Sequence, residues 1–340
     1  DTLERVEDRL LAERFDIAQW DGTGERRRVD SARREYVDGL LDAVDRDALA
    51  DADLTVALDP GHGAGALTSP TFFRELGCAV RTVNAQPDGH FPGRDPEPVA
   101  ENLDDLGELV RATDADLGVA HDGDADRAIF VDERGEFVAG GAALAALTEA
   151  ALGPGDTVVS AVNATQRLVD VVERAGADLT LTPIGSTYIV SRIRELRRAG
   201  ASVPVAGEGN GGILFPEYRL ARDGAYTAAR FVELLAASDD PTSALVARYD
   251  GYENVRLDLA YDGEEERAAM LAAIERTAKQ SEGDLDTTDG YRLDFGDGWV
   301  LARPSGTEPV VRIYAEAGSK SRAEELAEVF NGAIAGRTAD

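Results

Sequence analysis

Three aspartates on alternate positions mark the stretch LGVAHDGDADRAIFVDE, residues 117–133. Asp122, Asp124 and Asp126 lie between two apolar runs, so the pattern predicts a strand, a tight acidic turn and a second strand. Carboxylates at i, i+2 and i+4 of a turn can converge on one point, and hard oxygen ligands suit Mg²⁺ and, less well, Ca²⁺. The next residue, Arg127, is a fixed cation whose planar fork could bind a phosphate. The sequence therefore predicts a metal loop beside a phosphate.

Three other interpretations of this loop stay open. It could be a solvated acidic hairpin, although three aspartates between buried strands repel one another without a counterion. An EF-hand loop would use Asp122, Asp124, Asp126 and Glu133, but Arg127 stands where that motif needs glycine, and both flanks are strands. A haloacid-dehalogenase-like phosphatase would use Asp122 as the nucleophile and Asp124 as the acid–base.

The stretch GEGNGG, residues 207–212, is the second candidate site. Glu208 and Asn210 lie two residues apart on a glycine-rich turn between apolar segments. Glycines let a ligand approach the backbone closely, and a carboxylate and an amide at this spacing could bind two neighbouring hydroxyls of a sugar. A plain hairpin turn explains the same residues equally well.

The stretch ARPSGTEPVVR, residues 302–312, is the third. Arg303, Ser305, Gly306 and Thr307 bring a guanidinium, two hydroxyls and free backbone N–H groups to one tight loop, and Arg312 follows on the next strand. This is the composition of an anion-binding nest, so the loop is a candidate phosphate site. A purely structural turn is the alternative.

The elements that must carry these loops follow from the hydrophobic pattern. Strands and helices alternate between residues 30 and 136, and again between 137 and 250, which predicts two α/β domains with the metal loop in the first and the sugar loop in the second. After residue 250 the order strand, helix, three strands, helix predicts a smaller α+β domain that carries the phosphate loop. Residues 1–29 show one helical pattern, followed by a short predicted strand at RFDIAQW, residues 14–20.

Two further features have structural explanations. Gly61, Gly63 and Gly65 follow a predicted strand, but their spacing is wrong for a dinucleotide-binding G-x-G-x-x-G, so they predict a tight strand-to-helix turn. Cys78 is the single cysteine, which excludes a disulfide within the chain, and its apolar neighbours predict a place in the core.

The composition is strongly acidic. The chain has 340 residues, with 65 Asp and Glu against 35 Lys and Arg, which gives a net charge of −30. Only Lys279 and Lys320 are lysines, and this pattern indicates adaptation to a high-salt cytoplasm, where salt screens the self-repulsion. The charge argues against nucleic-acid or anionic-membrane partners. We find no signal peptide and no apolar run that could span a bilayer, so a cytoplasmic location is expected.

The motifs HDGDADR, GEGNGG and RPSGTEP, in this order and with DPGHGAG and FPGRDPEP, resemble those of the α-D-phosphohexomutase family, the phosphomannomutase/phosphoglucomutase enzymes. The resemblance covers about residues 1–335. It implies three α/β/α three-layer domains and a fourth, smaller α+β domain of TATA-binding-protein type around a central cleft. Residues 1–29 would be a remnant of the first domain or a linker. The second domain would span 30–136, the third 137–250 and the fourth 251–340.

The same resemblance implies a function. The chain would interconvert hexose 1-phosphate and 6-phosphate, of mannose or glucose, through a bisphosphorylated intermediate with Mg²⁺ as cofactor. The implied roles are metal binding by Asp122, Asp124 and Asp126, a place beside the transferring phosphoryl group for Arg127, sugar binding by Glu208 and Asn210, and binding of the non-reacting phosphate by Arg303, Ser305, Gly306, Thr307 and Arg312.

The departures from the family pattern affect catalysis. The family's first domain carries a phosphoserine in a T-A-S-H-N-P-like loop, and these 340 residues contain no such loop; SPTFF, at Ser69, does not match it. We therefore expect the chain to be inactive unless a further domain or a separate chain supplies the serine. Gly212 replaces a histidine of some members, and TPIGS (residues 182–186) replaces a turn that often carries lysine and histidine or aspartate, which leaves the general base unassigned. A non-catalytic sugar-phosphate-binding protein and an Asp122 phosphatase are the alternatives.

Overall fold

A computed structural model describes residues 2–306 and 308–336 of the chain. The chain divides into two units between Tyr36 and Val37. In the first unit, α1 (Thr2–Leu11) precedes a long segment without regular structure, and α2 (Ala32–Leu41) begins at its end. The short strand predicted at residues 14–20 is wrong: this stretch is coil, and within its own unit it has no neighbouring strand to pair with.

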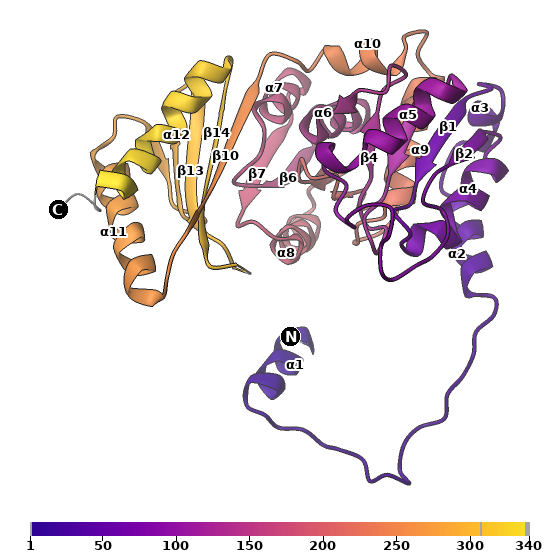
Figure 1. The fold of residues 1–340 in the computed structure, drawn as a ribbon, viewed down its shortest axis with the longest axis horizontal. Helices are drawn as coiled ribbons and strands as arrows, with labels where there is room; N and C mark the ends of the chain where they lie inside the picture. The colour runs from indigo at the N-terminus through magenta and orange to yellow at the C-terminus, as the bar shows by residue number, and fades with distance from the viewer. Residues whose placement is uncertain (1, 307, 337–340) are drawn as a thin grey trace. The chain divides into compact units, whose positions relative to one another are not determined.

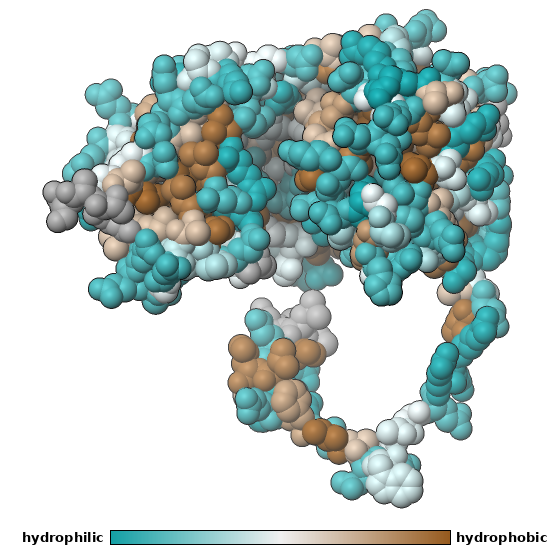
Figure 2. All heavy atoms as spheres, in the orientation of Figure 1, coloured by the Kyte–Doolittle hydropathy of each residue, from teal (hydrophilic) through white to brown (hydrophobic). Residues whose placement is uncertain are grey.

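The first unit exposes many of its apolar side chains. They gather as brown spheres around α1 in Figure 2, and Trp20 reaches an exposed fraction of 88%. The exposed large apolar residues of this unit are Val6, Leu10, Leu11, Phe15, Ile17, Trp20 and Val29. Residues 5–35 of this unit are all exposed, so they form no apolar core, and the assignment of residues 1–29 to a remnant or a linker stays a prediction.

The second unit begins with a five-stranded sheet in the order β2-β1-β3-β4-β5. Its strands β1, β2 and β4 are labelled in Figure 1. Strands β2, β1 and β3 are parallel, while β4 and β5 are antiparallel additions. All four residues of β3 are buried, as expected for a strand covered on both faces. The elements are α3 (Arg46–Ala50), β1 (Thr55–Asp59), η1 (Ala64–Leu67), α4 (Ser69–Glu75), β2 (Ala79–Thr82), η2 (Ala100–Asn102), α5 (Asp104–Thr113), β3 (Leu117–Ala120), β4 (Ile129–Val131) and β5 (Phe137–Val138).

A second α/β layer follows, with a four-stranded sheet in the order β7-β6-β8-β9. The strand β8 is short, because only Ala206 and Gly207 pair with the neighbouring strands. The elements are α6 (Gly140–Ala151), β6 (Thr157–Ala161), α7 (Gln166–Ala175), β7 (Asp178–Thr182), α8 (Ser186–Arg198), β8 (Ala206–Gly207), β9 (Ile213–Leu214), α9 (Gly224–Ala236) and α10 (Thr242–Ala247). Strands β8 and β9 form a hairpin whose connection is the sugar loop.

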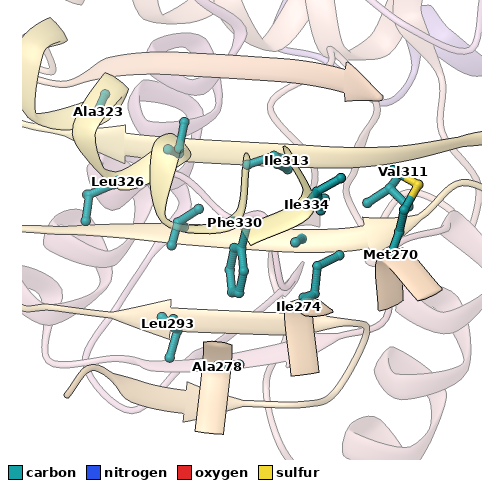
Figure 3. Close-up of a cluster of buried hydrophobic side chains, with 14 of the residues drawn as sticks. Met270, Ile274, Ala278, Leu293, Val311, Ile313, Ala323, Leu326, Phe330 and Ile334 are labelled. Carbon is teal, nitrogen blue, oxygen red and sulfur yellow. The ribbon is translucent and has the colours of Figure 1, made fainter. Parts of the chain in front are cut away.

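The last part is an antiparallel five-stranded sheet in the order β10-β14-β13-β12-β11, with two helices packed against it. Figure 3 shows Phe330 and Ile334 of one helix and Ile274 of the other among the side chains of the strands. Alternate burial along β14 leaves one sheet face for this core. The elements are β10 (Glu253–Ala260), α11 (Glu264–Gln280), β11 (Asp284–Asp286), β12 (Tyr291–Asp294), β13 (Gly298–Pro304), β14 (Val310–Ala317) and α12 (Lys320–Ala335).

The predicted fold class is confirmed: two α/β parts precede a smaller α+β part, each with its own sheet. The boundaries at residues 30, 137 and 251 stay predictions. Cys78 is buried and unpaired, as expected, and burial raises the pKa of its thiol to about 11, which makes it unreactive. Among the described residues, no helix combines the length and apolar character needed to cross a bilayer.

Candidate active site

The metal loop connects β3 to β4 and brings its three aspartates together. Asp122, Asp124 and Asp126 each offer a carboxylate oxygen, and these oxygens lie within 4.8 Å of one another. The turn is closed by the backbone: Ala125 N donates to Asp122 O at 3.1 Å, and Ala125 takes a left-handed conformation with φ of 61°. Such a conformation costs energy in a residue with a side chain, so the surrounding contacts must hold it in place.

His121 fixes the base of this loop. The Nδ1 atom of the buried imidazole lies 2.8 Å from Arg127 O, and the Nε2 atom lies 3.1 Å from Ser69 Oγ. A carbonyl oxygen can only accept, so Nδ1 carries the proton and Nε2 accepts from the serine hydroxyl. Burial lowers the pKa of His121, which keeps the ring neutral in this arrangement. The side chain therefore connects His121, just before the acidic turn, to Arg127 at the end of that turn and to Ser69 at the start of α4.

Arg94 holds the Pro-rich loop FPGRDPEP against the same turn. Its buried guanidinium donates from Nε to Asp59 Oδ2 at 2.8 Å and from Nη2 to His121 O at 2.6 Å. Glu97, three residues further on, places Oε1 at 3.3 Å from Arg127 Nη1. The sequence analysis did not identify Asp59, Arg94 and Glu97 as parts of the site. Their signal was the FPGRDPEP motif and the aspartate of DPGHGAG, noted above only as supporting motifs.

The carboxylates of the metal loop are suited to a hard divalent cation. Burial raises the pKa of Asp122, with Asp126 and Asp124 adding repulsion. Asp126 Oδ1 is buried and accepts no hydrogen bond from the described residues, and Arg127 Nε lies 3.8 Å away from it. Three convergent carboxylates with an unpartnered buried oxygen fit Mg²⁺ by the chemistry of the donor set.

The sugar loop buries one of its two candidate residues. Glu208 is buried and Asn210 is exposed, and Asn210 Oδ1 accepts from Gly212 N at 3.0 Å. Both residues line a cavity of about 360 Å³. Burial raises the pKa of Glu208, while the charges of Arg222, Arg127 and Arg303 lower it by smaller amounts. Cations of the metal loop and of the phosphate loop therefore act on the same buried carboxylate.

One contact joins the metal loop to the sugar loop, and another joins it to the start of α9. Ala128 N donates to Gly211 O at 3.2 Å, and the guanidinium of Arg222 donates to Asp126 Oδ2. The helix α9 begins at this place, where Asp223 caps it by accepting from Tyr226 N at 3.1 Å. The sequence did not identify Arg222 as a neighbour of the metal loop.

The phosphate loop presents two arginines side by side. Arg303 of β13 and Arg312 of β14 are direct cross-strand partners, an arrangement of like charges that is unfavourable without an anion. Arg303 Nε lies 3.0 Å from Asp289 Oδ2, and Arg312 pairs with Glu308. Two guanidiniums on adjacent strands at the mouth of a tight loop are suited to a phosphate.

The remaining residues of the phosphate loop are placed as follows. Ser305 N donates to Val310 O at 2.8 Å, and its hydroxyl accepts from Glu308 N at 3.3 Å, so this serine shapes the turn. Gly306 is exposed with open space around its Cα. Thr307 lies outside the described residues. Asp289, which was missed, also accepts from Ile184 N at 3.0 Å and so links the TPIGS turn to Arg303.

Comparison with known families matches three consecutive segments of the chain. Residues 34–135 match the phosphoglucomutase/phosphomannomutase α/β/α domain II, residues 135–252 match domain III, and residues 254–333 match the C-terminal domain.

Individual relatives agree with these matches. A phosphoglucomutase/phosphomannomutase of Thermococcus kodakarensis is 40% identical over 326 residues, which cover 95% of this chain and 70% of the relative. A protein of Methanopyrus kandleri named "Probable phosphoglucosamine mutase" is 39% identical over 96% of this chain and 71% of its own length. A solved family protein from Burkholderia thailandensis superposes with a TM-score of 0.81 at 28% identity and covers 98% of this chain and 69% of that one.

Proposed function

Since the chain belongs to the phosphoglucomutase/phosphomannomutase family, we propose that it carries the metal, sugar and phosphate loops of a Mg²⁺-dependent mutase that interconverts hexose 1-phosphate and 6-phosphate. One observation supports this most directly. The cavity lined by Glu208 and Asn210 is also lined by Tyr314 of β14, the strand that follows the phosphate loop. On its other side the sugar loop meets the metal loop, because Ala128 N donates to Gly211 O at 3.2 Å. A single bound sugar phosphate could therefore contact all three loops.

The proposed roles follow from the chemistry of each loop. Arg303 and Arg312 bind the phosphate that does not react, and the open backbone at Gly306 lets that phosphate approach. Glu208 and Asn210 bind sugar hydroxyls and so fix which end of the sugar faces the metal loop. Because the phosphate loop can bind a phosphate at either end of the sugar, turning the bisphosphorylated intermediate exchanges the two positions.

The metal loop would act on the transferring phosphoryl group. Asp122, Asp124 and Asp126 are the residues that would hold Mg²⁺, and the ion supplies positive charge that offsets the charge on the phosphoryl oxygens. Arg127 places a second cation 3.2 Å from Asp122 Oδ2, and Glu97 and the Asp122 carboxylate fix its direction. The serine that donates and recovers the phosphoryl group would come from outside residues 1–340, because these contain no T-A-S-H-N-P-like loop.

The identity of the hexose is part of the test. One relative is named a phosphoglucomutase/phosphomannomutase and another a probable phosphoglucosamine mutase. The test therefore uses glucose 1-phosphate, mannose 1-phosphate and glucosamine 1-phosphate. We expect calorimetry with this chain and Mg²⁺ to give saturable heats for at least one of them.

Two variants assign the signal to the loops. Arg303→Ala should weaken sugar-phosphate binding by about 10-fold or more, since a charge-assisted contact contributes about 1.5–3 kcal/mol. Asp124→Ala should remove Mg²⁺ binding, and Asp297→Asn, which removes a carboxylate paired with Arg322 in the last domain, should change neither. No heat with any of the three sugars at saturating Mg²⁺ would contradict the proposal.

A further inference from the structure

Arg222 lies between the two loops that bind different ligands. It directly precedes the N-cap of α9, and its Nη2 donates to Asp126 Oδ2, 96 residues earlier in the chain. The side chain is 19% exposed, so most of it is enclosed by the neighbouring loops. A surface arginine that only kept the protein soluble would not be held in this way.

The same side chain lies against the sugar loop. A Cβ atom added to Gly212 would come within 2.8 Å of Arg222 Cδ and 2.9 Å of its Nη1. That added atom would also lie 3.0 Å from Asn210 Oδ1, so the arginine and the asparagine occupy the space on the same side of Gly212. Of the three cations that act on the buried Glu208, Arg222 has the largest influence. One guanidinium therefore contacts the metal loop directly and lies beside the sugar loop.

The two oxygens of Asp126 have different surroundings. Arg222 binds Oδ2, whereas Oδ1 is buried and accepts no hydrogen bond from the described residues. Arg222 thus orients the carboxylate with one oxygen left for a cation, in the way that a hydrogen-bond partner orients a metal ligand. A cation bound at Oδ1 would partly neutralise the negative charge of Asp126. The attraction between Asp126 and Arg222 would then be weaker, and more of the positive charge of Arg222 would act on the sugar loop.

We propose that Arg222 is a positioning residue that couples the metal loop to the sugar loop, so that Mg²⁺ and the sugar phosphate each strengthen the binding of the other. The inference rests on the proposed function, because it takes the two ligands from it. Coupling between two sites is reciprocal, so Mg²⁺ must raise the affinity for the sugar phosphate by the same factor as the sugar phosphate raises the affinity for Mg²⁺. The alternative is that Arg222 only anchors α9, in which case its loss would weaken both ligands without changing that factor.

The test is a thermodynamic cycle measured by calorimetry on this chain. The affinity for hexose 1-phosphate is determined with saturating Mg²⁺ and with EDTA, and the Mg²⁺ affinity with and without the sugar phosphate. The cycle is repeated for Arg222→Met, for Arg222→Lys and for the control Arg230→Met. The control removes an equal charge from within α9, where Arg230 Nε lies 3.0 Å from Glu233 Oε2. Thermal unfolding of each variant shows whether it is folded.

The expected coupling factor is about 5-fold or more in the unchanged chain and in Arg230→Met. It should fall to near 1 in Arg222→Met and to an intermediate value in Arg222→Lys, which keeps the charge but loses the fork. An equal factor in Arg222→Met and the unchanged chain would overturn the inference while leaving the proposed function intact. Failure of the unchanged chain to bind either ligand would overturn both. If Arg222→Met is unfolded, an undiminished factor in Arg222→Lys would overturn the inference.

Discussion

The imidazole of His121 spans the base of the metal loop, and its two nitrogens have separate tasks. Asparagine places an amide nitrogen near the position of Nδ1, whereas glutamine places it near Nε2. We therefore predict that His121→Asn keeps the bond to Arg127 O and binds Mg²⁺ nearly as well as the unchanged chain. His121→Gln should lose about 10-fold or more in Mg²⁺ affinity, the usual effect of removing a group that orients a ligand loop.

Calorimetric titration with Mg²⁺ measures the difference between the two variants. They carry the same functional group in the same buried place, so each is the control for the other. Equal losses in both would mean that His121 serves only to fill the core, and the assigned tautomer would lose its support.

The buried carboxylate of Glu208 gives a prediction about pH. Its pKa is raised by burial, so the folded state binds its proton more tightly than the unfolded state does. Stability is then lost as the pH rises from the ordinary value of 4.5 through the raised pKa, and the full cost is present at neutral pH. We predict that Glu208→Gln raises the melting temperature at pH 7 by roughly 2–4 °C, the effect of about 1 kcal/mol in a domain of this size.

The advantage of Glu208→Gln should shrink as the pH falls below 4.5, where the carboxyl is protonated in both the folded and the unfolded state. Glu149 is the control with the opposite sign, because a hydrogen bond from Tyr249 lowers its pKa. Glu149→Gln should therefore lower the melting temperature at pH 7, and this loss should shrink in acid. Melting curves across the pH range check both signs, and a pH-independent loss in Glu208→Gln would contradict the account.

The residues that the sequence identified share one property: each belongs to a short motif whose chemistry can be recognised locally. The three aspartates of one turn are the clearest case. Arg222 and Asp289 could not be found in this way, since each contacts a residue far from it in the chain. Such contacts depend on how elements pack, and a single sequence does not record that packing.

At the scale of elements, the start of α9 approaches the metal loop more closely than a side chain would permit. Gly224 N donates to Ala125 O at 3.0 Å, and a Cβ atom on Gly224 would lie 2.2 Å from Arg127 O. We predict that Gly224→Ala displaces the helix from the loop, lowers Mg²⁺ affinity by about 10-fold or more and lowers the melting temperature. Titration with Mg²⁺ and a melting curve measure the two effects.

Gly39, within α2, is the matched control. A Cβ atom there would meet nothing within 4 Å, and alanine is favoured over glycine inside a helix by about 1 kcal/mol. Gly39→Ala should therefore leave Mg²⁺ binding unchanged and slightly raise the melting temperature. If Gly224→Ala behaves like Gly39→Ala, the close approach does not hold the metal loop.

The regular spacing of apolar residues predicted most elements of the second unit, because the residues on a buried face recur at a fixed interval along a helix or strand. The helix α12 shows this, with a buried stripe that includes Leu326, Phe330 and Ile334. The strand expected at residues 14–20 was wrong, since a strand needs a partner that the local pattern cannot supply. The short strand β11, also not predicted, exists through its pairing with β12.

At the scale of the whole molecule, the net charge of −30 should make stability depend on salt. Mutual repulsion among carboxylates destabilises the compact state, and the screening length falls from about 10 Å at 0.1 M salt to about 3 Å at 1 M. We predict a melting temperature that rises by several degrees between 0.1 and 2 M KCl. A chloride salt is preferable to a sulfate, because sulfate is excluded from the protein surface and would stabilise the folded state even without charge screening. A flat or falling curve would contradict the predicted adaptation to high salt.

The central claim is that the three loops belong to a phosphohexose mutase, and ³¹P NMR tests it most directly. The protein as its own cells produce it is incubated with glucose 1-phosphate or mannose 1-phosphate, Mg²⁺ and a trace of the corresponding 1,6-bisphosphate. The 1-phosphate signal should convert into the 6-phosphate signal, EDTA should stop the conversion, and Asp124→Ala should abolish it. Release of inorganic phosphate that is lost in Asp122→Asn, or no change in any signal, would contradict the mutase and favour the phosphatase or the binding protein respectively.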